Sequence, residues 1–138
     1  MIKAADILSI PVFVTTQNRA HLGDTSAELP VAAAVENTDK TVFSMWVPSI
    51  AAHFASSEPS EIAIVGLESH ICVTQTTLDV LAEGHKVYVL ADGVSSCNPQ
   101  EVPLALARLR AAGAVITSSE SFLYECMGDA AIPEYVRR

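Results

Sequence analysis

The stretch "VGLESHICVTQT", residues 65–76, joins a run of branched apolar residues to a segment with helical periodicity. The run that contains its start, "EIAIVGL" (61–67), is almost continuously apolar, which is typical of a strand covered on both faces. The segment "HICVTQTTLDVLAEG" (70–84) carries a broad apolar stripe, with Ser69 as the expected cap and Gly84 at the end. The sequence therefore predicts a strand that passes directly into a helix, with a cysteine at the junction.

The same alternation continues along the chain. Three further β-branched runs predict strands at 10–17, 86–92 and 114–120. A second helix is expected after Asn98 as its cap, with Pro99 in the first position, Glu101 completing a capping box and Gly113 at its end. A last helix is expected over 119–127. Strand and helix alternating in this way predict right-handed crossovers and a three-layer α/β/α fold with a mostly parallel, Rossmann-like sheet.

The segment 18–46 has weak periodicity and scattered polar residues. It is expected to be a long excursion from the sheet with one short edge strand near Thr41–Ser44. Long excursions in compact domains often carry function. The absence of repeats, low-complexity tracts and linkers favours a single domain over 1–138.

Composition narrows the class of protein. A chain of 138 residues, half of them apolar, can bury a sizeable core without disulfides or metals. Its three cysteines are widely spaced, which favours a reducing, cytoplasmic location. A formal charge of −8 disfavours nucleic acid and anionic membranes as partners, because the basic clusters, Arg108 with Arg110 and the pair at 137–138, are small.

Cys72 lies where ligands bind in open α/β sheets, at the carboxyl end of a strand and the start of a helix. With Ser69 as the cap, it occupies the third helical position, where the helix dipole favours thiolate over thiol. A thiolate there is a candidate nucleophile, and nearby N–H groups could hold an oxyanion. The alternative is a cysteine that fills space in the core. For Cys97, in a turn, and Cys126, in an apolar helix, packing is the favoured interpretation.

Two longer strings carry a family resemblance. "GLESHICVTQTTLDVLAEGHKVYVLADGVSS" and "ALARLRAAGAVITSSESFLYECMGDA", preceded by "IPVFVTTQNRAHLGDTSAELP" and "DKTVFSM", resemble the isochorismatase-like hydrolases, in particular the isochorismatase domain-containing proteins. The resemblance spans nearly the whole chain. It implies a cysteine hydrolase of the C–N amidohydrolase type that acts on a small amide, carbamoyl or related carbonyl compound, and a homo-oligomer.

The resemblance also implies roles for single residues. Cys72 would be the nucleophile and Lys40, in "DKTVFS", the lysine that supports its charge. A non-proline cis peptide would fall at Leu67–Glu68, and the backbone N–H groups of Glu68 and Cys72 would form the oxyanion hole. Gln17, Phe43 and Trp46 are candidate pocket residues from the sequence itself, because Phe43 and Trp46 flank the proposed lysine, although such aromatic residues are more often part of a core or an interface. From the residues alone, Lys40 after Asp39 could equally be half of a solvated surface pair.

The family's catalytic aspartate is expected upstream, at the end of a first, central strand. Asp6, Asp24 and Asp39 do not stand in that context, so the resemblance implies a domain that is incomplete at its N-terminus. Strands 10–17 and 61–67 would then pair directly, take a strand from another chain, or belong to a longer protein. This makes activity uncertain and leaves two alternatives open: an inactive relative that serves as an interaction or oligomerisation subunit, and a thiol redox sensor that uses Cys72.

No cofactor or metal is expected. The four histidines lack the D-x-H spacing of the metal sites found in nicotinamidases of the wider family. His70 is close to Cys72 in sequence, but two residues apart on a helix they point in different directions. No G-x-G-x-x-G and no P-loop motif occurs. The expected partner is a small-molecule substrate.

Overall fold

The computed structural model describes residues 1–55 and 58–136, so the predicted basic pair at 137–138 lies outside the described residues. The chain divides into two compact units, one formed by Met1–Thr41 with Glu120–Arg138 and the other by Val42–Ser119. The single domain expected over 1–138 stays a prediction. Within the described residues, no helix combines the length and the apolar character that crossing a membrane requires.

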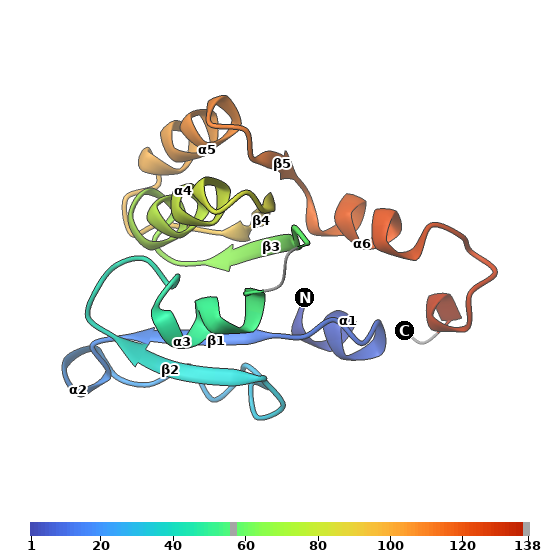
Figure 1. Cartoon of the computed structure of the whole chain (residues 1–138), viewed down its shortest axis with the longest axis horizontal. Helices are drawn as coiled ribbons and strands as arrows, with labels where there is room; N and C mark the ends of the chain where they lie inside the picture. The colour runs from blue at the N-terminus through green and yellow to red at the C-terminus, as the bar shows by residue number, and fades with distance from the viewer. Residues whose placement is uncertain (56–57, 137–138) are drawn as a thin grey trace. The chain divides into compact units, whose positions relative to one another are not determined.

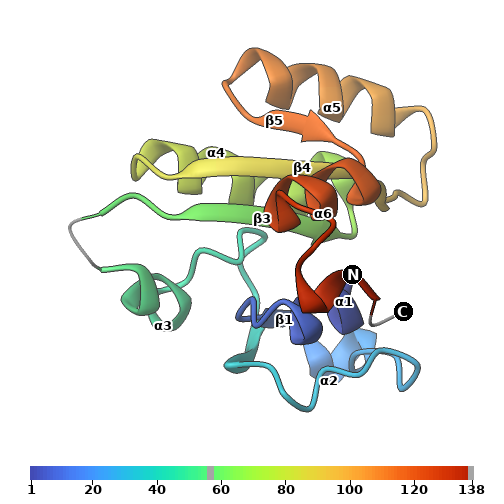
Figure 2. The same ribbon diagram turned by 90° about the vertical axis from the view of Figure 1, so that its right-hand side faces the viewer.

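The unit Val42–Ser119 is built on a three-stranded parallel sheet. Its strands β3 (Glu61–Gly66), β4 (Lys86–Val94) and β5 (Val115–Thr117) are hydrogen-bonded in that order and lie side by side in Figure 2. The connections carry a π-helical turn η2 (Ser69–Val73) that continues into α4 (Thr74–Ala82), and then α5 (Glu101–Ala111). Before β3 come α3 (Pro48–Ala51) and the 3-10 turn η1 (Ala52–Phe54). The predicted α/β fold with parallel strands is confirmed.

The core of this unit lies between the sheet and its helices. Val87, Val89 and Leu90 of β4 are fully buried, as expected for the central strand of a parallel sheet. Val80 of α4 and Leu109 of α5 are buried against them. Arg108 and Arg110 are exposed, as the pattern of the helix predicted.

The other unit contains a two-stranded parallel sheet. Its strands β1 (Phe13–Gln17) and β2 (Glu36–Lys40) pair in a register that runs from Phe13↔Glu36 to Gln17↔Lys40. The same unit contains α1 (Ile2–Ile7), α2 (Arg19–Leu22), η3 (Pro133–Val136) and, from Glu120 onward, α6 (Ser119–Met127) (Figure 1).

The predicted edge strand near Thr41–Ser44 is wrong, because the strand that exists is β2, directly before it. Its sequence "ENTDK" is polar and gives no β signal, yet its backbone pairs with β1 over all five residues. Direct pairing between the strands predicted at 10–17 and 61–67 is also not found, since β1 and β3 belong to different sheets.

The starts of the helix after β3 and of α5 differ from the sequence prediction, whereas α6 starts where it was predicted. Helix α5 begins at Glu101 with Gln100 as its cap, so Asn98 as the predicted cap is wrong. The N–H of Asn98 donates to Ser96 Oγ at 3.0 Å. Helix α6 has the predicted bounds and is followed by Gly128 at φ +66°. Its first residue, Ser119, donates its N–H to Asp92 Oδ1 at 2.7 Å and its hydroxyl to the other carboxylate oxygen of Asp92.

Gly93 makes the close approach between β3 and β4 possible. A Cβ at this position would lie 2.7 Å from Val65 Cγ1, beside the point where the β3–β4 register shifts. Because valine is stiff at χ1, we expect Gly93→Ala to lower the free energy of unfolding by about 1–3 kcal/mol, measured by urea denaturation. In a Val65→Ala background the same change should cost much less. An equal cost in both backgrounds would contradict this packing account.

Thr77 of α4 has a fully buried hydroxyl without a hydrogen-bond partner among the described atoms. An unpaired buried hydroxyl loses its hydration, so we expect Thr77→Val to raise the free energy of unfolding by about 1 kcal/mol. Thr74→Val on the same helix is the matched control, because Thr74 Oγ1 donates to the carbonyl of Ser69 at 2.7 Å. That variant should instead lose about 1 kcal/mol. Equal losses in both variants would show that Thr77 has a partner.

Candidate functional site

The cysteine predicted to be functional lies in the turn after β3. This strand ends at Gly66, which has φ +129°. One residue further on, the peptide bond Leu67–Glu68 is cis, as the family resemblance implied. The helix then begins with a π-helical turn whose cap is Glu68, so Ser69 as the predicted cap is wrong. Cys72 is therefore the fourth helical residue, still within the first turn where the dipole acts.

Ser69 is not the cap because its hydroxyl has a tertiary partner. Its N–H and its Oγ–H both donate to the carbonyl oxygen of Ser95, at 2.9 Å and 2.6 Å. Ser95 in turn donates its N–H to the carbonyl of Gly66 at 3.3 Å. Ser69 is fully buried, so these bonds are formed away from water. The cysteine turn is thereby attached to the segment that follows β4.

Glu68 adds a second attachment to the same segment. Its carboxylate accepts the N–H of Cys97 at 2.8 Å and the hydroxyl of Ser96. The hydrogen bonds from Ser96 and Cys97 hold the pKa of Glu68 below its ordinary value of 4.5. Nδ1 of His70 lies 3.3 Å from Ser96 Oγ, so His70 also faces this segment.

Threonine hydroxyls donate further hydrogen bonds to carbonyls of the π-helical turn. Thr76 Oγ1 donates to the carbonyl of Cys72 at 2.6 Å and accepts the N–H of Met45 at 2.9 Å. Turns of this kind occur frequently at functional sites. The Thr76 hydroxyl thus links the carbonyl group of Cys72 to the backbone of Met45.

The three cysteines differ in exposure from what the sequence predicted. Cys72 is partly exposed, which agrees with a group that solutes can reach and disagrees with a core residue. Cys97 and Cys126 are both exposed, so the packing role predicted for them is wrong. Cys97 lies in an exposed turn, where its N–H donates to Glu68. Cys126 lies on α6, a helix that buries none of its residues.

In the other unit, Lys40 is at the carboxyl end of β2 and is only 7% exposed. Its Nζ donates to Gln17 Oε1 at 2.6 Å, and Gln17 Nε2 donates to the carbonyl of Thr41 at 2.7 Å. Gln17 is the last residue of β1 and lies opposite Lys40 in the register. The alternative of a solvated surface pair between Lys40 and Asp39 is therefore wrong.

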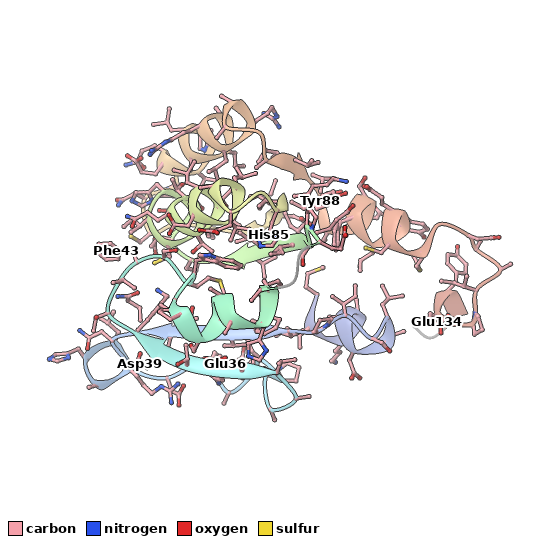
Figure 3. The ribbon with its side chains drawn as sticks, in the orientation of Figure 1. Glu36, Asp39, Phe43, His85, Tyr88 and Glu134 are labelled. Carbon is pink, nitrogen blue, oxygen red and sulfur yellow. The ribbon has the colours of Figure 1, made fainter. Side chains whose placement is uncertain are left out.

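Asp39 has partners of its own near the end of β2 (Figure 3). Its Oδ1 accepts the N–H of Arg19 at 3.0 Å and the hydroxyl of Thr16 at 2.9 Å. The backbone hydrogen bond from Arg19 lowers the pKa of Asp39, and the Thr16 hydroxyl adds to this effect. Asp39 thus holds the start of α2.

The two aromatic residues predicted to wall a pocket have different surroundings. Trp46 packs against Phe54 and His85, with ring centroids 5.2 Å and 5.4 Å away, and it adjoins the hydrophobic core. Phe43 is 50% exposed. Their role as pocket walls stays a prediction.

The structure thus brings together some of the predicted residues and adds others. Gln17 and Lys40 are joined by a hydrogen bond between their side chains. Glu68 and Cys72 lie in one turn, which hydrogen bonds hold to the segment after β4. Sequence reasoning missed Ser69, Ser95 and Ser96 as the braces. The signal was present, since the serines of "DGVSS" follow β4 and the carboxyl ends of neighbouring parallel strands meet at one edge. Among the described residues, no group of three or more His, Cys, Asp and Glu is placed to hold a metal.

The parallel α/β fold is that of the isochorismatase-like hydrolases. The family model described as "Isochorismatase domain" matches residues 1–121, so the chain belongs to the isochorismatase domain family.

Relatives and solved structures support this assignment. The secreted isochorismatase effector Isc1 of Phytophthora sojae (strain P6497) is 41% identical over 141 residues, which cover 98% of this chain and 67% of the relative. The MAR1 ribonuclease of Caenorhabditis elegans has a TM-score of 0.90 at 37% identity and covers 97% of this chain and 70% of that one. YcaC from Pseudomonas aeruginosa, solved with hexane-2,5-diol and covalent acrylamide, has a TM-score of 0.84 at 26% identity over 96% and 68% of the two chains.

The chain spans between 48% and 67% of the length of the curated relatives that it matches. The activity and partners of the whole protein are therefore proposals. The cytoplasmic location also stays a prediction, since one relative is named a secreted effector.

The Glu68 attachment makes a prediction about pH. A carboxylate whose pKa is lowered on folding stabilises the native state above its unfolded value of 4.5, and this stability is lost as the pH falls through the lower folded value. We expect Glu68→Gln to lower the urea midpoint at neutral pH and the difference from wild type to close in acid. Ser96→Ala removes the largest of the bonds and should shift the NMR titration of Glu68 toward 4.5. An unchanged titration would remove Ser96 from the brace.

Proposed function

We propose that the protein is a cysteine-dependent hydrolase of small amide, carbamoyl or related carbonyl compounds. The observation that carries the proposal is the placement of Cys72, partly exposed in a first helical turn that buried hydrogen bonds attach to the segment after β4. A thiolate in this position is favoured by the helix N-terminus. Membership of the isochorismatase domain family adds the hydrolase precedent.

The proposed reaction forms and breaks one bond to sulfur. The Cys72 thiolate attacks the carbonyl carbon, and the N–H groups of Glu68 and Cys72 stabilise the oxyanion. The C–N bond breaks, the amine leaves as it takes up a proton, and a thioester remains. Water then adds to the thioester, the acid leaves, and the thiolate is regenerated.

Lys40 is proposed to support the negative charge in this reaction. It is a buried ammonium at the carboxyl end of a parallel strand, which is where ligands bind in sheets of this kind. Burial makes its charge more effective, since it is less screened by water. A surface lysine would have little effect.

A second candidate function is cleavage of RNA, because one similar protein is named a ribonuclease. The formal charge of −8 argues against it, since RNA binding depends on neutralising phosphates with basic residues. An RNA oligonucleotide included as a substrate in the same assays tests this candidate directly.

The experiment measures ammonia or amine release from nicotinamide and p-nitroacetanilide, with acrylamide as a covalent probe. We expect acrylamide to add to Cys72 in preference to the exposed Cys97 and Cys126, as mapped by peptide mass spectrometry. Cys72→Ala should abolish that adduct and reduce hydrolysis by more than about 1,000-fold. Cys97→Ala is the matched control and should retain both.

Hydrolysis that survives Cys72→Ala would overturn the proposal. Preferential labelling of Cys72 without turnover of any probe would favour the inactive relative that serves as an interaction or oligomerisation subunit, and size-exclusion chromatography with light scattering would then show whether a homo-oligomer forms. Reversible oxidation of Cys72 without turnover would favour the redox sensor.

A further inference from the structure

The environment of Lys40 contains an interaction that the proposed reaction does not explain. Lys40 ends β2 and Gln17 ends β1, and the two residues are partners in the parallel register. The 2.6 Å bond between Lys40 Nζ and Gln17 Oε1 is formed by an ammonium that is 7% exposed. In such a site water competes weakly, so the hydrogen bond has a strong influence on where the ammonium lies.

The amide of Gln17 is itself fixed in orientation. Its Nε2 donates to the carbonyl of Thr41 at 2.7 Å, and a carbonyl oxygen can only accept. The NH₂ group must therefore face Thr41, and the oxygen must face Lys40. The hydrogen-bond network thus decides the amide orientation without ambiguity.

The choice of an amide has an electrostatic consequence. Glutamate has nearly the same shape and would also accept the hydrogen bond, but it would add a negative charge to the lysine. Glutamine holds the ammonium in place and contributes no opposing charge. Gln17 therefore does not itself reduce the positive charge that the proposed function assigns to Lys40.

We propose that Gln17 is a positioning residue that orients the Lys40 ammonium, because its fixed and uncharged side-chain amide accepts the ammonium's hydrogen bond. This inference rests on the proposed function only where it links Lys40 to hydrolysis. It differs from the sequence prediction for Gln17, which placed it on the pocket wall.

The first experiment tests the positioning without any substrate. Trace acetylation with acetic anhydride across a pH series reports the titration of each lysine, and Lys3 and Lys86 serve as internal controls. We expect Gln17→Glu to raise the midpoint of Lys40 labelling by about one pH unit or more, because a carboxylate favours the ammonium. Gln17→Leu should lower that midpoint, because the hydrogen bond to the ammonium is lost.

Matched variants keep this experiment decisive. Gln100→Glu makes the same chemical change at an exposed position and should leave the Lys40 midpoint unchanged. If Gln17→Leu fails to fold, as judged by circular dichroism, Gln17→Glu decides alone, since it preserves both shape and acceptor. A Lys40 midpoint that is the same in Gln17→Glu and in wild type overturns the proposal.

The second experiment separates positioning from substrate contact. If wild type hydrolyses nicotinamide or p-nitroacetanilide, Gln17→Glu should lower kcat by about tenfold or more and leave KM within about a factor of two. A raised KM with unchanged kcat would mean that Gln17 binds substrate, and the proposal would be wrong. If wild type hydrolyses no probe, the proposed function fails, while the labelling experiment still decides the role of Gln17.

Discussion

The cysteine turn depends on the two hydrogen bonds that Ser69 donates to the carbonyl of Ser95. Both are buried, so removing them would leave a carbonyl without a partner where water cannot replace it. They join the residues that follow β3 to those that follow β4. The π-helical turn and the Glu68 carboxylate build on this attachment, and together they determine where the backbone of Cys72 lies.

The fold was predictable wherever burial determines the sequence. Strand β4 is buried over most of its length, so it must be apolar and β-branched, and its position followed from that pattern. Strand β3 was found from the same apolar pattern, but the expectation that it is covered on both faces is wrong, because Glu61, Ala63 and Val65 are exposed. The end of α6 was predictable because Gly128 adopts a positive φ. Strand β2 was not, because its polar residues are held by backbone pairing with β1, which leaves no trace in hydrophobicity.

The candidate site was predictable only in part, for a related reason. The position of Cys72 follows from the order of strand and helix, which the sequence records. The identity of the helix cap does not follow from the sequence. A serine before a helix gives the same local pattern whether its hydroxyl bonds to its own helix or to a distant carbonyl, and the Ser69 hydroxyl bonds to a distant carbonyl. The burial of Lys40 and its bond to Gln17 join residues 23 apart, which only the strand register reveals.

Both candidate reactive residues have a carboxylate close by in the sequence, and in both cases it is engaged by a backbone N–H. Asp39 accepts from Arg19, and Glu68 accepts from Cys97, and each has a pKa below its ordinary value. A carboxylate held in this way stays ionised at neutral pH and is directed at an amide donor. A carboxylate beside Lys40 would offset the positive charge with which the lysine is proposed to support an anion. A carboxylate beside Cys72 would raise the pKa of the thiol and so disfavour the thiolate. Backbone N–H donors therefore fix both carboxylates, and the proposed function assigns these carboxylates no part in the reaction.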